Sequence, residues 1–132
     1  MSQLNAEQAP EAAPARILVV EDDPLVRFAM AEVLRDLGVS VVEATTADEA
    51  WDYLTAGAPV DLVFTDHQMP GSMSGAQLVL RINQHYPLIK TVVTSGYIDP
   101  LERPASVLNK PYDMFKTAVD LVGLAITNRQ KE

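Results

Sequence analysis

The chain alternates short apolar blocks with blocks of helical periodicity, and no other feature limits its fold as strongly. Blocks of strand length occur at 17–20, 39–43, 62–65, 91–94 and 105–108. Most of their positions are apolar in succession, which is typical of strands covered on both faces in a parallel sheet. Helical blocks separate the first four and follow the fifth. We therefore predict an α/β fold, a doubly wound parallel sheet of five strands.

Capping residues mark where the helices begin and end. We expect helices over 24–37, 46–57 and 75–85, and a closing helix that begins near Asp113. Thr46 with Glu49 and Ser74 with Gln77 match the capping box, in which each side chain bonds to the other residue's amide. The remaining signals are the N-cap pair Asp23-Pro24, the C-terminal glycines Gly38 and Gly57, and the breaking pair Tyr86-Pro87.

Apolar residues recur at helical spacing within these segments, which predicts the faces that pack on the sheet. We place Trp51 in the core. We expect the apolar residues of the closing helix to pack against the sheet. The two longest sets are Leu25, Phe28, Ala29, Val33 and Leu37 in the first helix, and Phe115, Val119, Val122 and Ile126 in the last.

The segment between the fourth and fifth strands is unlike the other connections. It contains Pro100 and Pro104 within a few residues of Gly96. Proline removes an amide donor and clashes with the preceding helical turn. The fourth helix is therefore predicted to be short or absent.

Composition narrows the class of protein. The 132 residues, 48% of them hydrophobic, suffice for one domain, which we place at 16–130 after a disordered leader over 1–15. The formal charge of −8 disfavours nucleic-acid binding, because such domains need basic residues against phosphate. The sequence has no cysteine and no apolar run long enough to span a membrane. We expect a soluble, cytoplasmic protein without membrane insertion.

Acidic residues follow the strands at positions that the topology brings together. Glu21 and Asp22 follow the first strand and Asp66 the third, while Ser95 follows the fourth and Lys110 the fifth. In a doubly wound sheet with right-handed crossovers, the strand C-termini share the edge where ligands bind. Adjacent carboxylates repel one another unless a cation lies between them. We expect these five side chains to form one site.

The residue types at this edge suit a hard cation and a phosphoryl group. Carboxylate ligands without cysteine favour Mg²⁺ or Mn²⁺, which keep several waters. Lys110 supplies a charge for a phosphoryl oxygen, and Ser95 followed by Gly96 supplies a hydroxyl and an accessible amide. No Ser/His/Asp or Cys/His couple is evident. We interpret His67, beside Asp66, as a solvated neighbour rather than a proton shuttle.

Four fragments in order resemble the receiver domain of two-component response regulators. They are "ILVVEDDP", "DLVFTDHQMPG", "VVTSGY" and "NKPY", and each lies at the end of a predicted strand. The resemblance spans 16 to about 128 and implies the flavodoxin-like receiver fold. Their agreement in order and in position makes the resemblance specific.

The resemblance assigns roles to residues of this chain. It implies that Asp66 is the phosphoacceptor, attacking the phosphohistidine of a sensor kinase or a phosphotransfer protein. Asp22, Asp66 and the Gln68 carbonyl would bind the metal, and Glu21 would act partly through water. Lys110 would pair with the phosphoryl group. The resemblance also implies a cis Lys110-Pro111 bond, which would aim the ammonium. Ser95 would turn to bond the same group.

Some positions depart from the family. Glu21 stands where Asp is commoner. Thr94 and Ser95 both offer a hydroxyl, and we choose Ser95 because Gly96 follows it. The aromatic switch position, three residues before the lysine, is Val107, so aromatic rotation cannot operate there.

The short gap between Ser95 and Lys110 resembles a subgroup of receivers with a small-Gly-Tyr motif after the fourth strand. In that subgroup the region is mobile. We hypothesise that Tyr97 takes over part of the signalling role and that phosphorylation orders residues 96–106, an order-disorder switch.

We interpret the chain as a single-domain response regulator that signals through a downstream protein partner, without binding nucleic acid directly. It would be a phosphoacceptor that promotes its own phosphoryl transfer and slow dephosphorylation, and not an enzyme with a separate substrate. A degenerate receiver, binding partners without phosphorylation, would keep the fold and remains an alternative. A Mg²⁺-dependent phosphatase is disfavoured, because Gln68 stands where its second catalytic acid would lie.

Overall fold

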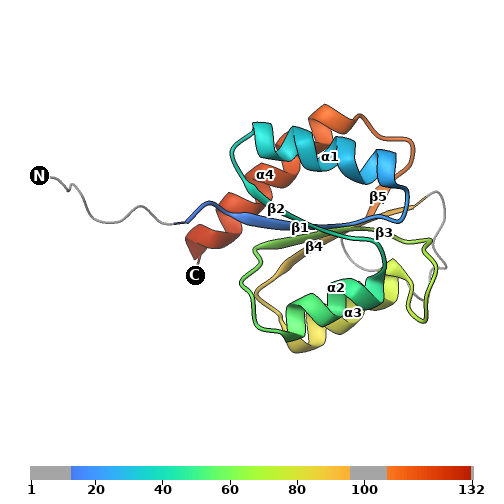
Figure 1. Cartoon of the computed structure of the whole chain (residues 1–132). Coiled ribbons are helices and arrows are strands. Elements are labelled where there is room, and N and C mark those ends of the chain that lie inside the picture. The colour runs from blue at the N-terminus through green and yellow to red at the C-terminus, as the bar shows by residue number, and fades with distance from the viewer. Residues whose placement is uncertain (1–12, 96–106, 132) are drawn as a thin grey trace, which may run out of the picture.

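Five parallel strands form one sheet in a computed structural model that describes residues 13–95 and 107–131 (Figure 1). The strand order is β2-β1-β3-β4-β5, and every neighbouring pair is parallel. The predicted doubly wound sheet is confirmed. The elements in chain order are β1 (Arg16–Val20), α1 (Pro24–Asp36), β2 (Ser40–Ala44), α2 (Ala47–Thr55), β3 (Leu62–Asp66), α3 (Gly75–His85), β4 (Lys90–Ser95), β5 (Val107–Asn109) and α4 (Met114–Lys131).

Helices cover both faces of the sheet. Figure 1 shows α1 and α4 on one face and α2 and α3 on the other. The apolar side chains of β1 alternate between two cores, with Ile17 and Val19 facing α1 and α4 and Leu18 and Val20 facing α2 and α3. All four are at most 2% exposed. Each buried aliphatic side chain of this size stabilises the fold by about 1.5–3 kcal/mol, which explains why this central strand is apolar throughout.

The buried faces of α1 and α4 agree with the prediction only in part. Val33 and Leu37 of α1 and Val122 of α4 pack partly buried on the core, as expected. Leu25 and Phe28 are 79% and 58% exposed, and Phe115, Val119 and Ile126 of α4 are 62%, 44% and 43% exposed. Each helix carries two apolar stripes, and the sheet can cover only one of them. The fully buried stripe consists of Met30, Ala31 and Leu34 in α1, and Ala118, Leu121 and Ala125 in α4. Leu80 of α3 is also exposed, whereas Trp51 packs partly buried on its core as expected.

The helix starts are mostly as predicted. Asp23 caps α1, its side chain accepting from the amides of Leu25 and Val26, and Ser74 and Gln77 form the full capping box of α3. In α2 only the forward bond forms, from the Glu49 amide to Thr46 Oγ1. The Glu49 carboxylate accepts instead from the amide of Thr45, at 2.6 Å, because the side chain reaches one residue beyond the cap.

Some predictions concern residues that the structure does not describe. The shortened fourth helix was placed between β4 and β5, where residues 96–106 lie outside the described part, as does most of the 1–15 leader. The closing helix, α4, begins at Met114. The Asp113 carboxylate precedes it and accepts a hydrogen bond from the Lys116 amide. β5 ends at Asn109, one residue later than predicted. None of the described helices is both long and apolar enough to cross a membrane.

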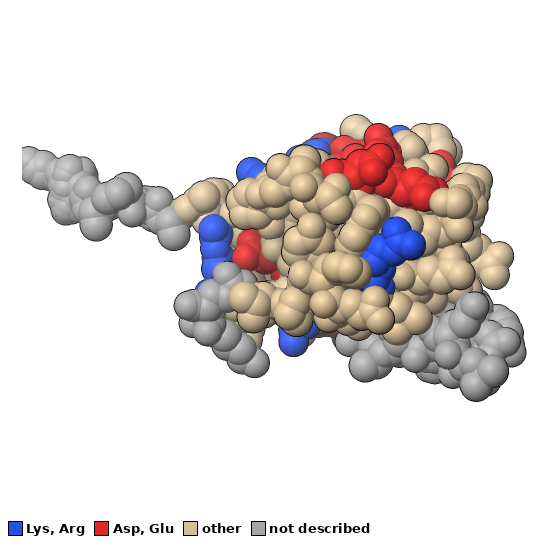
Figure 2. All heavy atoms as spheres, turned by 90° about the horizontal axis from the view of Figure 1, so that it is seen from below, with Lys and Arg blue, Asp and Glu red and all other residues tan. Residues whose placement is uncertain are grey.

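Surface charge is unevenly distributed. Figure 2 views the molecule from the side of α2 and α3 and shows the acidic side chains gathered toward one margin, whereas the basic side chains are scattered. Helix α2 contributes Asp48, Glu49 and Asp52 to its own surface. On the face that Figure 2 shows, negative charge is therefore concentrated toward one margin.

Candidate functional site

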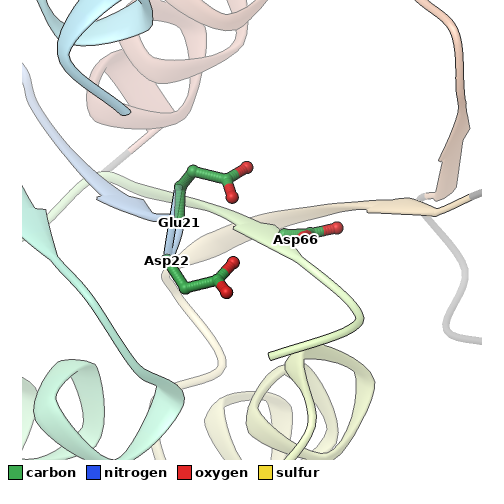
Figure 3. Close-up of side chains that lie close together, drawn as sticks. All are labelled: Glu21, Asp22 and Asp66. Atoms are coloured by element: carbon green, nitrogen blue, oxygen red, sulfur yellow. The ribbon is translucent and has the colours of Figure 1, made fainter. Parts of the chain in front are cut away.

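Three carboxylates converge at the edge of the sheet where the strands end. Glu21 and Asp22 follow β1, and Asp66 is the last residue of β3 (Figure 3). One oxygen from each lies within 4.8 Å of the others. Adjacent parallel strands place these residues side by side, with Val20 of β1 in register with Thr65 of β3. The predicted convergence of the acidic residues is confirmed.

Lys110 completes the charged cluster. Its Nζ lies 2.8 Å from Asp66 Oδ1, and Asp66 is only 7% exposed. The lysine follows β5, and the Lys110-Pro111 peptide bond is cis, as the family resemblance implied. The cluster thus brings one ammonium against three carboxylates, so negative charge remains in excess.

An open pocket surrounds the cluster. Its volume is about 780 Å³, and α1 and the residues after β5 form its walls. The lining residues are Glu21, Asp22, Asp23, Val26, Asp66, Lys110, Pro111, Tyr112 and Met114. The sequence motif "NKPY" contains Tyr112 but does not predict its place in the pocket wall, which depends on how the chain turns after Pro111. Its pKa is raised by burial and by the charges of Glu21 and Asp66.

The surroundings of Glu21 shift its pKa. Its pKa is raised from 4.5 to about 7, first because it is partly buried, and also because of the nearby Asp66 charge and a hydrogen bond with Asp22. The amide of Asp23 donates to its Oε2 at 3.0 Å and, with Lys110, opposes the shift. Asp23 itself serves α1 as the N-cap, so Glu21 and Asp22 are the two acids of this run that remain for a ligand.

The cluster fits a small divalent cation. Mg²⁺ binds oxygen at about 2.0–2.1 Å in octahedral geometry, so its opposite ligands lie roughly 4.2 Å apart. Three oxygens within 4.8 Å of one another need only a small inward movement to reach that spacing. A cation would also relieve the repulsion that raises the pKa of Glu21. The donor set therefore matches Mg²⁺ or Mn²⁺ in chemistry and in spacing.

His67 differs from the prediction, because it is buried rather than solvated. It is 7% exposed, and its Nδ1 accepts from the Ala76 amide at 3.3 Å. Its carbonyl accepts from the Gly75 amide at 2.9 Å. The imidazole thus binds an otherwise free amide at the start of α3, a capping role that spacing along the sequence does not reveal.

Gly75 is a site residue that the sequence analysis missed. A Cβ at this position would lie 1.9 Å from the Asp66 carbonyl oxygen and 2.9 Å from His67 Cα. Only glycine lets the start of α3 approach the end of β3 this closely. A glycine at the first position of α3 was the only sign of this in the sequence. The need for glycine there becomes clear only from the contact with Asp66 in the folded chain.

In the described part of the chain, the other predicted site residues make no hydrogen bond to a side chain of the acidic cluster. Gln68 is exposed and lines a neighbouring pocket with His67 and Ser74. Val107 is partly buried against Ala76, Val79 and Val93. Thr94 is 2% exposed. Gly96 and Tyr97, and the side chain of Ser95, lie outside the described part of the chain.

The comparisons with known proteins agree with this fold and site. The sequence matches the family model for the response regulator receiver domain over residues 17–113. The chain therefore belongs to the receiver domain family of two-component signalling, whose members work with sensor histidine kinases or phosphotransfer proteins.

Two relatives illustrate the relationship in sequence. Sensor kinase CckA of Brucella abortus (strain 2308) is 31% identical over 112 residues, which cover 79% of this chain and 12% of the kinase. Transcriptional regulatory protein FixJ of Azorhizobium caulinodans is 34% identical over 113 residues, covering 79% of this chain and 51% of FixJ. The chain thus spans about half of the latter relative and far less of the former.

A solved structure extends the comparison to the site. The response regulator protein TrrA of Thermotoga maritima, in complex with Mg²⁺-BeF, superimposes with a TM-score of 0.73 at 26% identity. The match covers 83% of this chain and 98% of TrrA. The family binds Mg²⁺ at an acidic pocket, and Glu21, Asp22 and Asp66 form an acidic cluster in this chain.

Proposed function

We propose that Asp66 accepts a phosphoryl group from a phosphohistidine of a partner kinase or phosphotransfer protein. The observation that carries the proposal is the buried Asp66 carboxylate, paired with Lys110 and flanked by Glu21 and Asp22 in an open pocket. The proposed nucleophile Asp66, the ammonium of Lys110 and the other two carboxylates thus lie together in a pocket that a phosphoryl donor can enter from solvent.

Transfer joins two anionic groups, so charge must be neutralised at the site. An Asp66 oxygen forms a bond to phosphorus as the phosphorus–nitrogen bond of the donor breaks, and the imidazole leaves with the electron pair. Lys110 lies within bonding distance of the nucleophile before transfer. Its ammonium can then pair with the phosphoryl oxygens as charge develops on them.

A divalent cation would supply the remaining positive charge. Glu21, Asp22 and Asp66, with the Gln68 carbonyl, would hold Mg²⁺ or Mn²⁺, Glu21 partly through water. Bound there, the ion neutralises phosphoryl oxygens. The acidic cluster of Glu21, Asp22 and Asp66 supports a cation here, and the complex of TrrA with Mg²⁺-BeF supports Mg²⁺ as that cation. Ser95, at the end of β4, would donate its hydroxyl to the same phosphoryl group, next to the Gly96 amide.

The output is proposed to be a contact with a downstream protein. Val107 excludes an aromatic switch at its position, so residues 96–106 with Tyr97 are proposed to change order on phosphorylation. The chain would act as a regulator in the cytoplasm, and its cycle would end with slow loss of the phosphoryl group. Unchanged amide exchange over 96–106 after phosphorylation would contradict the switch.

Intact mass after incubation with acetyl phosphate and Mg²⁺ tests the proposal. Wild type should gain one phosphoryl group, whereas Asp66→Asn and an EDTA control should gain none. Absence of an adduct at short times, before hydrolysis can remove it, would favour the phosphorylation-independent binding module instead. Turnover of small phosphate esters would point to the phosphatase class.

A further inference from the structure

The segment 67–74 connects the nucleophile to α3 and carries Gln68, so its course determines part of the site. Its two ends are held by local bonds, at His67 through the amides of Gly75 and Ala76, and at Ser74 through the capping box. Between these ends no helix or strand forms. Met73 is buried and Met69 packs partly buried on the core, whereas Pro70, Gly71 and Ser72 are exposed. Hydrophobic packing therefore does not fix residues 70–72, and a polar contact from another element can do so.

Asp48 of α2 supplies that contact. Its Oδ2 accepts from the Ser72 amide at 3.1 Å, and its Oδ1 accepts from Ser72 Oγ at 2.6 Å. Gly71, the residue before Ser72, has a φ angle of +114°. A Cβ at this position would lie 2.6 Å from Asp48 Oδ2, so a larger residue would collide with the carboxylate. Both carboxylate oxygens are thus directed at one residue 24 positions further along the chain.

The electrostatics agree with the geometry. Hydrogen bonds to a charged acceptor are stronger than those between neutral groups. The pKa of Asp48 is lowered, first by the Ser72 hydroxyl and then by the Ser72 amide. The segment therefore interacts preferentially with the ionised carboxylate.

An acid in the first turn of a helix has a simpler explanation, because it stabilises the helix dipole. Glu49, the next residue of α2, fits that explanation, since its carboxylate bonds to Thr45 at the start of its own helix. Asp48 differs, because both of its carboxylate oxygens accept hydrogen bonds from Ser72, in the segment after β3 and outside α2. The dipole alone does not account for that direction.

We propose that Asp48 is a positioning residue for the metal and phosphoryl site, acting through Ser72 on the segment that carries Gln68. The inference rests on the proposed function, since it assumes that this edge binds a divalent cation. Asp48 itself would contact neither the ion nor the phosphoryl group. Its loss should weaken ion binding by leaving the middle of segment 67–74 free to move.

Calorimetric titration with MgCl₂ tests the proposal. The variants are Asp48→Ala, Ser72→Ala and the double variant. Ser72→Ala changes no charge. If it also loses Mg²⁺ affinity, the loss in Asp48→Ala cannot be explained only by the removal of a negative charge that attracts the cation. Asp52→Ala is the matched control: it removes the same charge one helical turn along α2, and no bond joins Asp52 to segment 67–74 in the described part of the chain. Ser72→Thr keeps the hydroxyl and should restore binding.

We expect Asp48→Ala to bind Mg²⁺ about tenfold more weakly, the usual effect of losing a group that orients a ligand. Ser72→Ala should lose less, because the Ser72 amide still donates to Asp48. The double variant should be no weaker than the worse single one, because both break the same contact. Asp52→Ala should bind like wild type. Wild-type affinity in both single variants, or losses that add fully in the double variant, would overturn the proposal.

Amide hydrogen exchange in EDTA gives a second readout that needs no metal. Amides of 67–74 should exchange faster in Asp48→Ala than in Asp52→Ala. Wild-type protection of these amides in Asp48→Ala would overturn the inference even if Mg²⁺ binding fell. If wild type itself bound no Mg²⁺, the proposed function would fail together with the inference. If wild type bound the ion and the variants matched it, the inference alone would fail.

Discussion

Lys110 Nζ lies 2.8 Å from Asp66 Oδ1, although 44 positions separate the two residues. The contact joins the end of β5 to the end of β3, with β4 between them in the sheet. The Lys110 ammonium is thereby held beside the carboxylate that we propose as the phosphoacceptor. The pair is the basis of the first prediction.

Replacing Lys110 with methionine should slow phosphorylation of Asp66 about a hundredfold, the usual cost of removing one donor that stabilises developing negative charge. Methionine keeps the apolar stem and removes the charge. Lys110→Arg, which keeps the charge but changes its shape, should lose less. The rate of adduct formation from acetyl phosphate, followed by intact mass, measures both. Equal rates in wild type and Lys110→Met would contradict the role.

Without metal, Glu21 should make the stability of the protein depend on pH. Its pKa rises from 4.5 in the unfolded chain to about 7 in the fold, so the native state binds more protons between these values. Its contribution to stability is complete below pH 4.5 and is lost as pH rises through about 7. Thermal unfolding in EDTA should therefore show wild type losing stability relative to Glu21→Gln between pH 5 and roughly pH 8.

Mg²⁺ provides the control for this effect, because a bound cation offsets the repulsion among the carboxylates. In saturating Mg²⁺ the pH-dependent difference between wild type and Glu21→Gln should shrink or reverse. A difference in melting temperature that stays flat across pH in EDTA would show that Glu21 titrates normally in the folded protein.

Gly75→Ala should disturb both stability and the site. The added methyl group would meet the Asp66 carbonyl oxygen, so α3 or the end of β3 must shift, at a cost of about 1–3 kcal/mol. Phosphorylation should fall as well, since Asp66 moves with its backbone. Gly123→Ala is the matched control, because a Cβ there meets nothing within 4 Å in α4. That change should be neutral or stabilising. Equal unfolding free energies in urea for the two variants would refute the steric argument.

The two apolar stripes of α4 can be distinguished by truncation. Leu121 is 2% exposed and Phe115 is 62% exposed. Leu121→Ala should cost about 2–5 kcal/mol in unfolding free energy, and Phe115→Ala should cost less than about 1 kcal/mol. Denaturation in urea measures both. The reverse order would restore the packing face predicted from the sequence.

Prediction from the sequence failed where two answers satisfied the same local pattern. In α1, Leu25 and Phe28 have the same helical spacing as the stripe that is buried, so periodicity could not choose between them. His67 shows the same limit in another form. A histidine in a connection after a strand is usually solvated, but here the amide of Ala76 lies within reach of its ring. Both outcomes depend on which elements pack nearby.

The sequence by itself determined the alternation of strands and helices, the caps at Asp23 and Ser74, and the placing of Glu21, Asp22, Asp66 and Lys110 at strand ends. These follow from local patterns and from the rule that parallel strands end at one edge. Only the tertiary structure decided the buried faces of α1 and α4, the space that Gly75 must leave, and the bond from Asp48 to Ser72. Those features depend on the separation and orientation of elements distant in sequence, which no short segment encodes.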